Sequence, residues 1–388
     1  MYDVLEAHGI NVCLVNPRNM KNVPGKRTDY HECQWIQYLH AMGLLHAAFR
    51  PDMDVRAVRS LTRHRDDLVG MGSQHVQHIQ KALTQMNVQV QHVISDITGV
   101  TGLAIVDAIL AGERDTAVLA KLRDRRIKAD EETIRKSLAG NWRPEHMLTL
   151  KQSLKLYRDY QDQINECDKE IEKLISAFAP RVDPDEKPLP EDRKKKQRAR
   201  KKKTGSPDFN MRTEAYKLFG VDLSQIPGLM MLVFMLFSEV GRDMSRWPTA
   251  AHFVSWLGLC PDNDISGGKV LWRGARRTKS RAGTLFRLAA NGLHRDQTPM
   301  GHYLRRMKGK LGPAAAITAT AHKIAIIFYT MVKNQVEYDN SLWANRDAMR
   351  ERRNEAKFHK EALRRGYTPP PPTKTNTAAQ VIANRSVV

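Results

Sequence analysis

A serine followed by two glycines and a lysine, Ser266-Gly267-Gly268-Lys269, is the clearest candidate for chemistry in this sequence. Two adjacent glycines let a backbone come close to a phosphate group, and a neighbouring lysine can neutralise the phosphate charge. A serine hydroxyl in such a place can attack phosphorus when a base or a metal ion activates it. The plainer alternative is a Gly-Gly hairpin turn on a basic surface. The four residues alone leave both interpretations open.

The segment that follows this motif is strongly basic. Between Ser266 and Arg295 there are eight basic residues and no acidic one, and a second run at 193–203 has nine basic residues among eleven. A basic run can be a solvated segment or a localisation signal, but in a basic chain we predict that both segments contact nucleic-acid phosphates. The candidate binding residues are Gly267, Gly268, Lys269, Arg273, Arg276, Arg277, Lys279 and Arg281, with Lys194, Lys195, Lys196, Arg198, Arg200 and Lys201 in the earlier run.

Asp29 and Glu32 form the candidate metal-binding pair. They are three positions apart at the start of an expected helix, so both carboxylates lie on one face and are close enough to share a divalent ion. The alternative is a capping box, with Asp29 as the N-cap and Glu32 at the third helical position. A single pair is also fewer acidic ligands than two-metal phosphoryl transfer normally uses. The spacing leaves the question open.

Two long apolar seams predict the helices that would support these sites. Apolar residues recur at spacings of three and four from Val76 to Ile97 and again from Leu150 to Phe178. With a small helical insert at about 103–136 between them, the seams predict an antiparallel coiled-coil arm. Two long helices of an ordinary bundle are the alternative. We expect the first of these helices to end just before Gly99.

The N-terminal segment predicts a different kind of element. Residues 11–16 are a short apolar run between turn-forming residues, which is typical of a buried strand. A stable sheet usually has three or more strands, and no second buried strand is expected between residues 50 and 180. The predicted strand therefore lacks a partner.

Composition restricts the class of protein. The 388 residues carry 63 Lys and Arg against 42 Asp and Glu, a net charge of +21, which favours a polyanionic partner. The longest uninterrupted apolar run, from Leu229 to Phe237, is far shorter than the ~20 residues of a spanning helix. The four cysteines form no CxxC pair, and the acidic, amphipathic start does not look like a signal peptide. We expect an intracellular nucleic-acid-binding protein.

Two groups of residues together resemble one known family, the insertion-sequence 110 transposases, and in particular the subgroup typified by insertion sequence 1111. The resemblance covers most of residues 1 to about 340. The first group is Leu14-Val15-Asn16-Pro17, Lys21-Asn22-Val23-Pro24-Gly25, Thr28-Asp29 and Cys33-Gln34-Trp35. The second is Trp256-Leu257-Gly258-Leu259-Cys260-Pro261, Ile265-Ser266-Gly267-Gly268-Lys269 and Ala319-Thr320-Ala321-His322-Lys323.

The resemblance implies a mechanism. Family members join a domain resembling the Holliday-junction resolvase RuvC, which carries an Asp-Glu-Asp-Asp metal tetrad, to a domain whose serine becomes covalently linked to DNA. This implies that Ser266 is the nucleophile and that Asp29 and Glu32 are the third and fourth acidic positions, with Mg²⁺ as the expected ion. It also implies a structured guide (bridge) RNA, DNA partners at the element ends and the target, and a bacterial cytoplasmic, nucleoid-associated location. Separately, the apolar seams of the long helices predict self-association as a dimer or tetramer, and the short apolar runs predict no membrane partner.

The expected organisation is mainly α. It comprises a remnant of a RuvC-like α/β domain at 1–53, a helical coiled-coil arm with a small insert at 54–180, a basic linker at 181–210, a mostly helical transposase domain with the catalytic serine at 211–340, and a charged, partly disordered tail at 341–388.

Two departures from the family pattern put activity in question. The fourth acidic position is Glu instead of Asp, and the first two acidic positions fall upstream of Met1. We therefore expect a transposase with an incomplete tetrad, which is an N-terminally truncated reading frame, a reading frame whose start is assigned too late, or a fragment. One alternative is a catalytically inactive remnant that still binds nucleic acid and self-associates, and another is a basic coiled-coil scaffold without catalytic ancestry.

Overall fold

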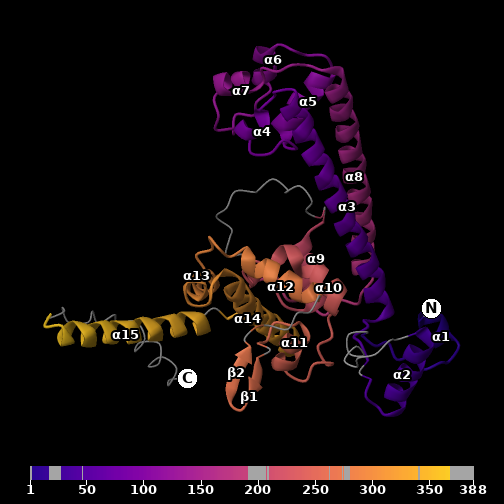
Figure 1. The fold of residues 1–388 in the computed structure, drawn as a ribbon, viewed down its shortest axis with the longest axis vertical. Coiled ribbons are helices and arrows are strands. Elements are labelled where there is room, and N and C mark those ends of the chain that lie inside the picture. Colours follow the sequence, from indigo (N-terminus) through magenta and orange to yellow (C-terminus); the bar gives the residue numbers. More distant parts are fainter. Residues whose placement is uncertain are drawn as a thin grey trace. The chain divides into compact units, whose positions relative to one another are not determined.

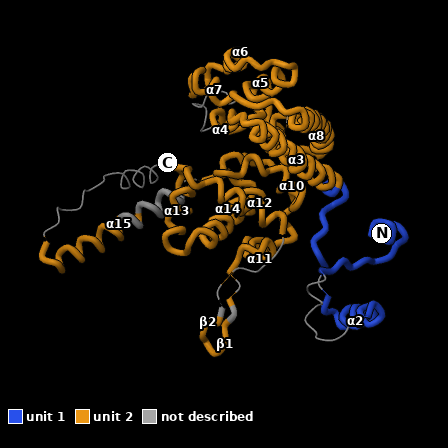
Figure 2. The backbone as a smooth tube through the Cα atoms, turned by 45° about the horizontal axis from the view of Figure 1, so that its top comes forward, with its two compact units in different colours: residues 1–56 blue, residues 57–388 orange. Residues whose placement is uncertain are grey.

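The structure, a computed structural model, describes residues 2–16, 28–45, 47–190, 207, 209–261, 263–272, 274, 280–339 and 341–367, and over these residues the chain is mainly helical (Figure 1). The chain divides into two compact units, residues 1–56 and 57–388 (Figure 2). The basic run at 193–203 lies outside the described residues, as does the end of the tail from residue 368.

The first unit contains two helices, α1 (Tyr2–Ala7) and α2 (Asp29–Ala41). Arg50 fixes α1 to the segment that precedes α3, because its guanidinium pairs with Asp3 and Glu6 and lies 3.7 Å from the centre of the Tyr2 ring. Arg56 also pairs with Asp3, at 2.6 Å. The acidic face of α1 is thus neutralised within this unit.

The expected buried strand at residues 11–16 is wrong in this structure. Only Val15 forms a bridge, an antiparallel one to Ala47, supported by a hydrogen bond of 2.6 Å from the Ala48 amide to the Leu14 carbonyl. Ile10 and Leu14 remain about half exposed. The apolar pattern is present, but among the described residues no strand pairs with this segment beyond the single bridge. There is therefore no sheet against which its apolar side chains could be buried.

Two helices of 33 residues each, α3 (Met53–Gln85) and α8 (Pro144–Ser176), lie side by side (Figure 1). Arg65 of α3 pairs with Asp168 of α8, and His75 stacks on Tyr160 with ring centroids 5.4 Å apart. Residue numbers rise along one helix as they fall along the other, so the pair is antiparallel. The buried residues of α8 include Leu150, Leu154, Tyr157, Ile164, Ile171 and Ile175.

The expected continuation of the first long helix to Gly99 is also wrong. The helix α3 ends at Gln85, and Asn87 has a φ of 60°, a left-handed conformation that a right-handed helix does not contain. The apolar spacing continues past this break because the following residues pack into a core at the ends of the two long helices. That core contains Ile79 and Leu83 of α3, Leu150 and Leu154 of α8, and residues of α4 (Val90–Val93), α5 (Val100–Leu110), α6 (Thr116–Lys121) and α7 (Glu131–Ser137).

The pair between Arg65 and Asp168 yields a stability prediction. The Asp168 side chain is 2% exposed, and its two carboxylate oxygens accept hydrogen bonds from Arg65 at 2.5 and 3.2 Å. Removing the carboxylate takes away two charge-assisted hydrogen bonds of the mostly buried Arg65 guanidinium, so we expect Asp168→Ala to lower the free energy of unfolding by about 3 kcal/mol. The double variant Arg65→Met with Asp168→Leu removes both charges and should recover most of that loss in urea unfolding. Equal stability of Asp168→Ala and the parent chain would contradict this.

The C-terminal helical domain begins with α9 (Met211–Phe219), two short 3₁₀ turns (Leu223–Gln225 and Met230–Leu232), α10 (Val233–Val240) and α11 (Ala250–Trp256). A hairpin of β1 (Asp264–Ser266) and β2 (Lys269–Trp272) follows, then α12 (Arg281–Asn291), α13 (Pro299–Leu311) and α14 (Pro313–Asn334). The helix α14 packs against α11, α12 and α13. Its Phe328 ring lies 6.2 Å from Phe253 and 5.6 Å from Phe286, between ring centroids.

The helix α14 is long and apolar enough, by length and composition, to cross a membrane. The length of the longest uninterrupted apolar run does not reveal this helix, because Thr, His and Lys residues interrupt its apolar sequence. In the structure it is a core helix, with Ala321, Ile324, Ala325 and Phe328 fully buried. Packing against three neighbouring helices accounts for its composition.

The tail of the chain begins with a further helix, α15 (Ser341–Arg364). Its sequence is rich in charged residues, and Glu361 pairs with Arg365 one turn along at 2.8 Å. Pairs of this kind support a solvent-exposed helix.

Candidate nucleophile hairpin and its surroundings

Ser266 lies at the tip of the β1–β2 hairpin, directly opposite Lys269. The two residues between them, Gly267 and Gly268, have φ values of 55° and 76°. Positive φ at both central positions is characteristic of the type I′ turn, which favours glycine because other side chains are strained there. The hairpin interpretation of the motif is therefore correct as geometry, and it leaves the chemical interpretation intact.

The hairpin tip is open to solvent. Ser266, Gly267, Gly268 and Lys269 are all exposed, and no atom lies within 4 Å of the position that a β-carbon would occupy on either glycine. Within the described part of the chain, neither the Ser266 hydroxyl nor the Lys269 ammonium has a side-chain partner. A hydroxyl without a base beside it is a weak nucleophile, so activation has to come from groups that arrive with the substrate or its other partners.

Both ends of the loop that carries the hairpin are fixed to the helical domain. At one end, Arg287 of α12 donates a hydrogen bond of 2.8 Å to the carbonyl of Gly258, which follows α11. At the other end, the Ser280 hydroxyl caps α12 by accepting from the Gly283 amide at 3.1 Å. Gly283 itself packs against α11, because a β-carbon there would lie 2.3 Å from the Leu257 carbonyl oxygen. The hairpin thus projects from a rigid base.

The structure describes only some of the basic residues that are predicted to bind nucleic acid. Arg273, Arg276, Arg277 and Lys279 lie outside the described residues, as do Lys194, Lys195, Lys196, Arg198, Arg200 and Lys201. Arg281 is described, and it donates a hydrogen bond of 3.0 Å to Asp66 of α3. Part of its charge is therefore engaged with the long helix, although the side chain stays about half exposed.

An ionic cluster around Glu239, which no sequence pattern indicates, joins α3 to the C-terminal domain. Arg63 binds the Glu239 carboxylate with two hydrogen bonds of 2.9 Å. Arg59 donates to the carbonyls of Ser238 and Glu239, at 2.8 Å each, and so satisfies the C-terminal end of α10. The hydrogen bonds to Glu239 raise the pKa of Arg63, whereas burial lowers the pKa of Arg59. No local pattern could have indicated contacts between residues about 176 positions apart.

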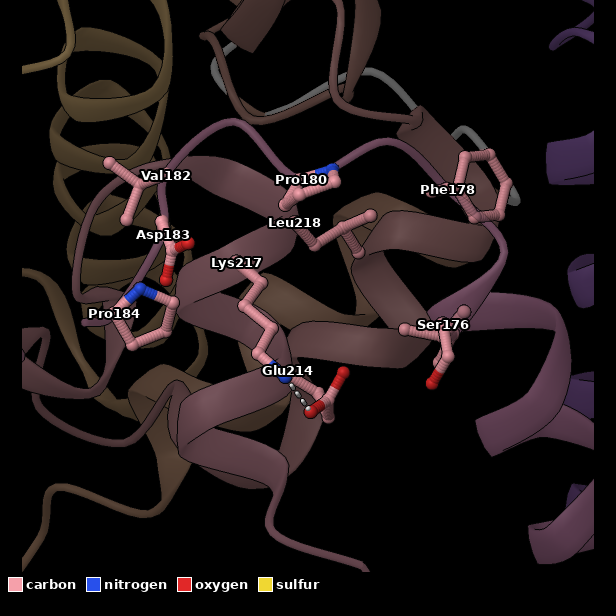
Figure 3. Close-up of a pocket in the computed structure, with 10 residues that line it drawn as sticks. Ser176, Phe178, Pro180, Val182, Asp183, Pro184, Glu214, Lys217 and Leu218 are labelled. Atoms are coloured by element: carbon pink, nitrogen blue, oxygen red, sulfur yellow. Dashed lines mark hydrogen bonds and ion pairs between the residues drawn. The ribbon is translucent and has the colours of Figure 1, made fainter. Parts of the chain in front are cut away.

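Two cavities lie at the junctions of the second unit. One, of about 240 Å³, is lined by residues of α3, α10 and α12, including Arg63, Glu239 and Arg281. The other, of about 250 Å³, lies between the end of α8 and α9, where Pro180, Pro184 and Leu218 form apolar walls and Lys217 pairs with Glu214 at 3.0 Å (Figure 3). None of the predicted catalytic residues lines either cavity.

The acidic pair lies on the first turn of α2, in the other compact unit. Thr28 is the N-cap, and its hydroxyl accepts from the His31 amide, so the alternative of a capping box with Asp29 as N-cap is wrong. Asp29 and Glu32 are both exposed. A search of the described residues finds no group of three or more His, Cys, Asp or Glu side chains that could hold a metal ion. The two carboxylates alone do not fit a divalent-metal site, which calls for more ligands.

The motif around His322 belongs to the core and not to the exposed tip. Thr320 and Ala321 are fully buried in α14, and the Thr320 hydroxyl donates a hydrogen bond of 2.8 Å to the Ala316 carbonyl. Burial, and then the neighbouring charge of Lys323, lower the pKa of His322. The imidazole is therefore neutral near pH 7.

An exposed serine at the tip of a hairpin, two long antiparallel helices and a strongly basic composition fit a protein that processes nucleic acid. Comparison with known proteins agrees. Residues 1–88 match a family model for the DEDD-type IS110 transposase, and residues 222–303 match the model of the transposase IS116/IS110/IS902 family. Two separate regions of the chain are therefore similar to IS110-type transposases.

One relative is the insertion element IS110 uncharacterized 43.6 kDa protein of Streptomyces coelicolor, 28% identical over 139 residues. The match covers 34% of this chain and 33% of that relative, so the chain spans about a third of the relative's length. The DEDD-type domain suggests a divalent-metal requirement. The match at 1–88 includes Asp29 and Glu32, and the match at 222–303 includes the whole hairpin.

Proposed function

We propose that this chain is a DNA transposase in which Ser266 forms a covalent phosphoserine bond with DNA. The observation that carries the proposal is the hairpin itself, which presents Ser266 at an exposed tip opposite Lys269. In the proposed step the Oγ–phosphorus bond forms and the bond from phosphorus to a sugar oxygen breaks. The hydroxyl proton leaves Oγ, and the departing sugar oxygen takes up a proton. Lys269 contributes a positive charge beside the phosphate, where negative charge increases during attack.

We further propose that a structured RNA guides the protein to its DNA sites and that the protein acts as a dimer or tetramer. The net charge of +21 supports contact with long polyanions, and the two regions similar to IS110-type transposases support DNA as the substrate. The proposed roles of Asp29 and Glu32 as Mg²⁺ ligands rest on the family resemblance. Because the described residues do not make a metal site, we derive no step through the ion.

Trapping the covalent intermediate tests this function. The full chain is incubated, with Mg²⁺ present, with radiolabelled DNA carrying the ends of the element that encodes it and with RNA transcribed from the adjacent non-coding DNA. A labelled species that survives boiling in detergent and disappears on protease treatment is the expected result. Its absence under all combinations of DNA and RNA would contradict the function for this chain.

A second candidate function is nucleic-acid binding without cleavage. The unpartnered Ser266 hydroxyl and the lack of a metal cluster among the described residues favour it over a fully assembled active site. In that case gel-shift assays would detect DNA and RNA binding while the covalent species stayed absent.

The basic run before the C-terminal domain carries a separate prediction. Each lysine that contacts a phosphate releases counterions, so the logarithm of affinity falls with the logarithm of salt in proportion to the number of contacts. Replacing the six lysines with glutamine should weaken DNA and RNA binding and flatten this slope. Unchanged affinity and slope would show that the run is only a spacer. The replaced residues are Lys194, Lys195, Lys196, Lys201, Lys202 and Lys203.

A further inference from the structure

The hairpin has a second, apolar side that the proposed chemistry does not use. Neighbouring residues in a strand point to opposite faces, so the paired residues Ile265 and Val270 lie on the face opposite to Ser266 and Lys269. Ile265 is 62% exposed and Val270 is 39% exposed. Leu271, at the register shift next to this pair, is 71% exposed. We call the paired residues Ile265 and Val270 the apolar patch.

Such exposure requires an explanation. Ile, Val and Leu are among the residues most often buried in proteins, and a cluster of them on a surface indicates an interaction site. The hairpin has only two strands, so no further strand covers it within the described sheet. The bulge at the register shift twists the hairpin locally and directs side chains away from regular pairing.

The position and charge of the surroundings indicate what covers the patch. Ser266 and Ile265 are consecutive residues on opposite faces, and among the described residues nothing covers Gly267 and Gly268 at the tip between the strands. A nucleic-acid strand that passes around this tip therefore places a phosphate at Ser266 on one face and the adjoining sugar and base at Ile265 on the other. The sequence from Ser266 to Arg295 contains eight basic residues and no acidic one. The positive charge of this segment repels a second copy of the +21 chain, and it attracts a nucleic acid.

We propose that the apolar patch packs against the sugar and base next to the phosphate that Ser266 attacks and opens the base stack there. This inference rests on the proposed function. A two-stranded ribbon is narrow enough to enter a DNA groove, and apolar side chains inserted between base steps unstack and kink the duplex. Unstacking beside the attacked phosphate turns that phosphate outward, where the hydroxyl at the hairpin tip can approach it.

Site-specific photocrosslinking with the full chain tests the contact directly. Ile265 is replaced by the photoreactive p-benzoylphenylalanine, and the protein is irradiated with labelled duplex DNA carrying an element end. The matched control has the same replacement at Leu148, which is 56% exposed on α8. We expect at least a tenfold higher yield of DNA crosslinks from position 265. Crosslinks from position 265 to a second copy of the chain, no crosslink, or an equal yield from position 148 would each overturn the proposal.

A binding measurement separates the apolar contact from charge. Ile265→Thr combined with Val270→Thr keeps β-branched residues that favour a strand but removes apolar surface. We expect about tenfold weaker DNA binding, with an unchanged dependence on salt because no charge is removed. Unaltered affinity in this double variant would overturn the proposal.

Failure of the proposed function and failure of this inference give different experimental results. In Ser266→Ala the apolar patch is intact, so crosslinking from position 265 persists when the covalent adduct disappears. If instead the adduct persisted in Ser266→Ala, the nucleophile assignment would fail while the crosslink would still report DNA against the patch. The position of the crosslink on the DNA tests the further inference separately. In the protein that retains Ser266, the nucleotide crosslinked from position 265 must lie next to the phosphate that carries the adduct.

Discussion

Ser266→Ala is expected to abolish the covalent protein–DNA species, lowering its rate of formation by at least about a thousandfold. Alanine removes the only atom of this side chain that can bond to phosphorus. The hairpin should keep its shape, because the turn is set by the positive φ of Gly267 and Gly268 and the serine side chain has no partner within the described structure. DNA binding should therefore stay within about twofold of the parent chain, since no charge is lost.

The matched control is Ser255→Ala, which removes an exposed serine of α11 in the same domain. It should form the adduct at the parent rate. Tryptic digestion of the trapped species, followed by mass spectrometry, should place the nucleotide on the peptide that contains Ser266. An adduct that persists in Ser266→Ala, or that maps to another peptide, would show that a different residue is the nucleophile.

The sequence predicts the local elements well because their signals are local. The paired glycines at 267 and 268 predicted a hairpin turn, and the turn forms with both φ values positive. The apolar spacing from Leu150 to Phe178 predicted a long helix, and α8 covers Pro144–Ser176. In both cases the residues that carry the pattern lie within one element, so neighbours along the chain decide the outcome.

The failures have a common physical cause, which is that long-range packing decides what an apolar pattern becomes. The residues from Val88 to Ile97 continue the spacing of α3, yet the chain leaves the helix at the left-handed Asn87, and these residues fill the core between the ends of α3 and α8 and the helices that follow. The segment 11–16 has the pattern of a buried strand but finds only one bridge, between Val15 and Ala47. The contact between Arg63 and Glu239 joins residues 176 positions apart, and nothing near either residue indicates its partner.

The candidate site could be predicted only in part for the same reason. The motif Ser266-Gly267-Gly268-Lys269 is contiguous, so its geometry follows from turn chemistry. A metal centre needs ligands from several elements, and the pair Asp29 and Glu32 supplies only one turn of one helix. The N-cap was missed because Thr28 and Asp29 are both good caps, and only the structure shows that Thr28 is the one that accepts a hydrogen bond.

Lys269→Met is expected to slow adduct formation by about a hundredfold, the usual cost of losing one group that stabilises developing negative charge. The register places Lys269 directly opposite Ser266, so the two side chains leave the same face with β-carbons ~5 Å apart. A lysine stem spans that distance, and its ammonium can contact a non-bridging oxygen of the phosphate that the hydroxyl attacks. Methionine keeps a similar length without the charge.

A change in rate alone does not separate this role from general attraction of DNA. Loss of one phosphate contact lowers the salt-dependence slope by about one, so Lys269→Met should show both the smaller slope and the slow reaction. The control Lys310→Met removes an exposed lysine from α13 and should alter binding at most, with the reaction rate at saturating DNA unchanged. Lys269→Arg retains the charge and should recover at least a tenth of the parent rate. A Lys269→Met protein that reacts at the parent rate when saturated with DNA would show that the lysine only attracts DNA, and the charge beside the attacked phosphate would then have to come from other residues.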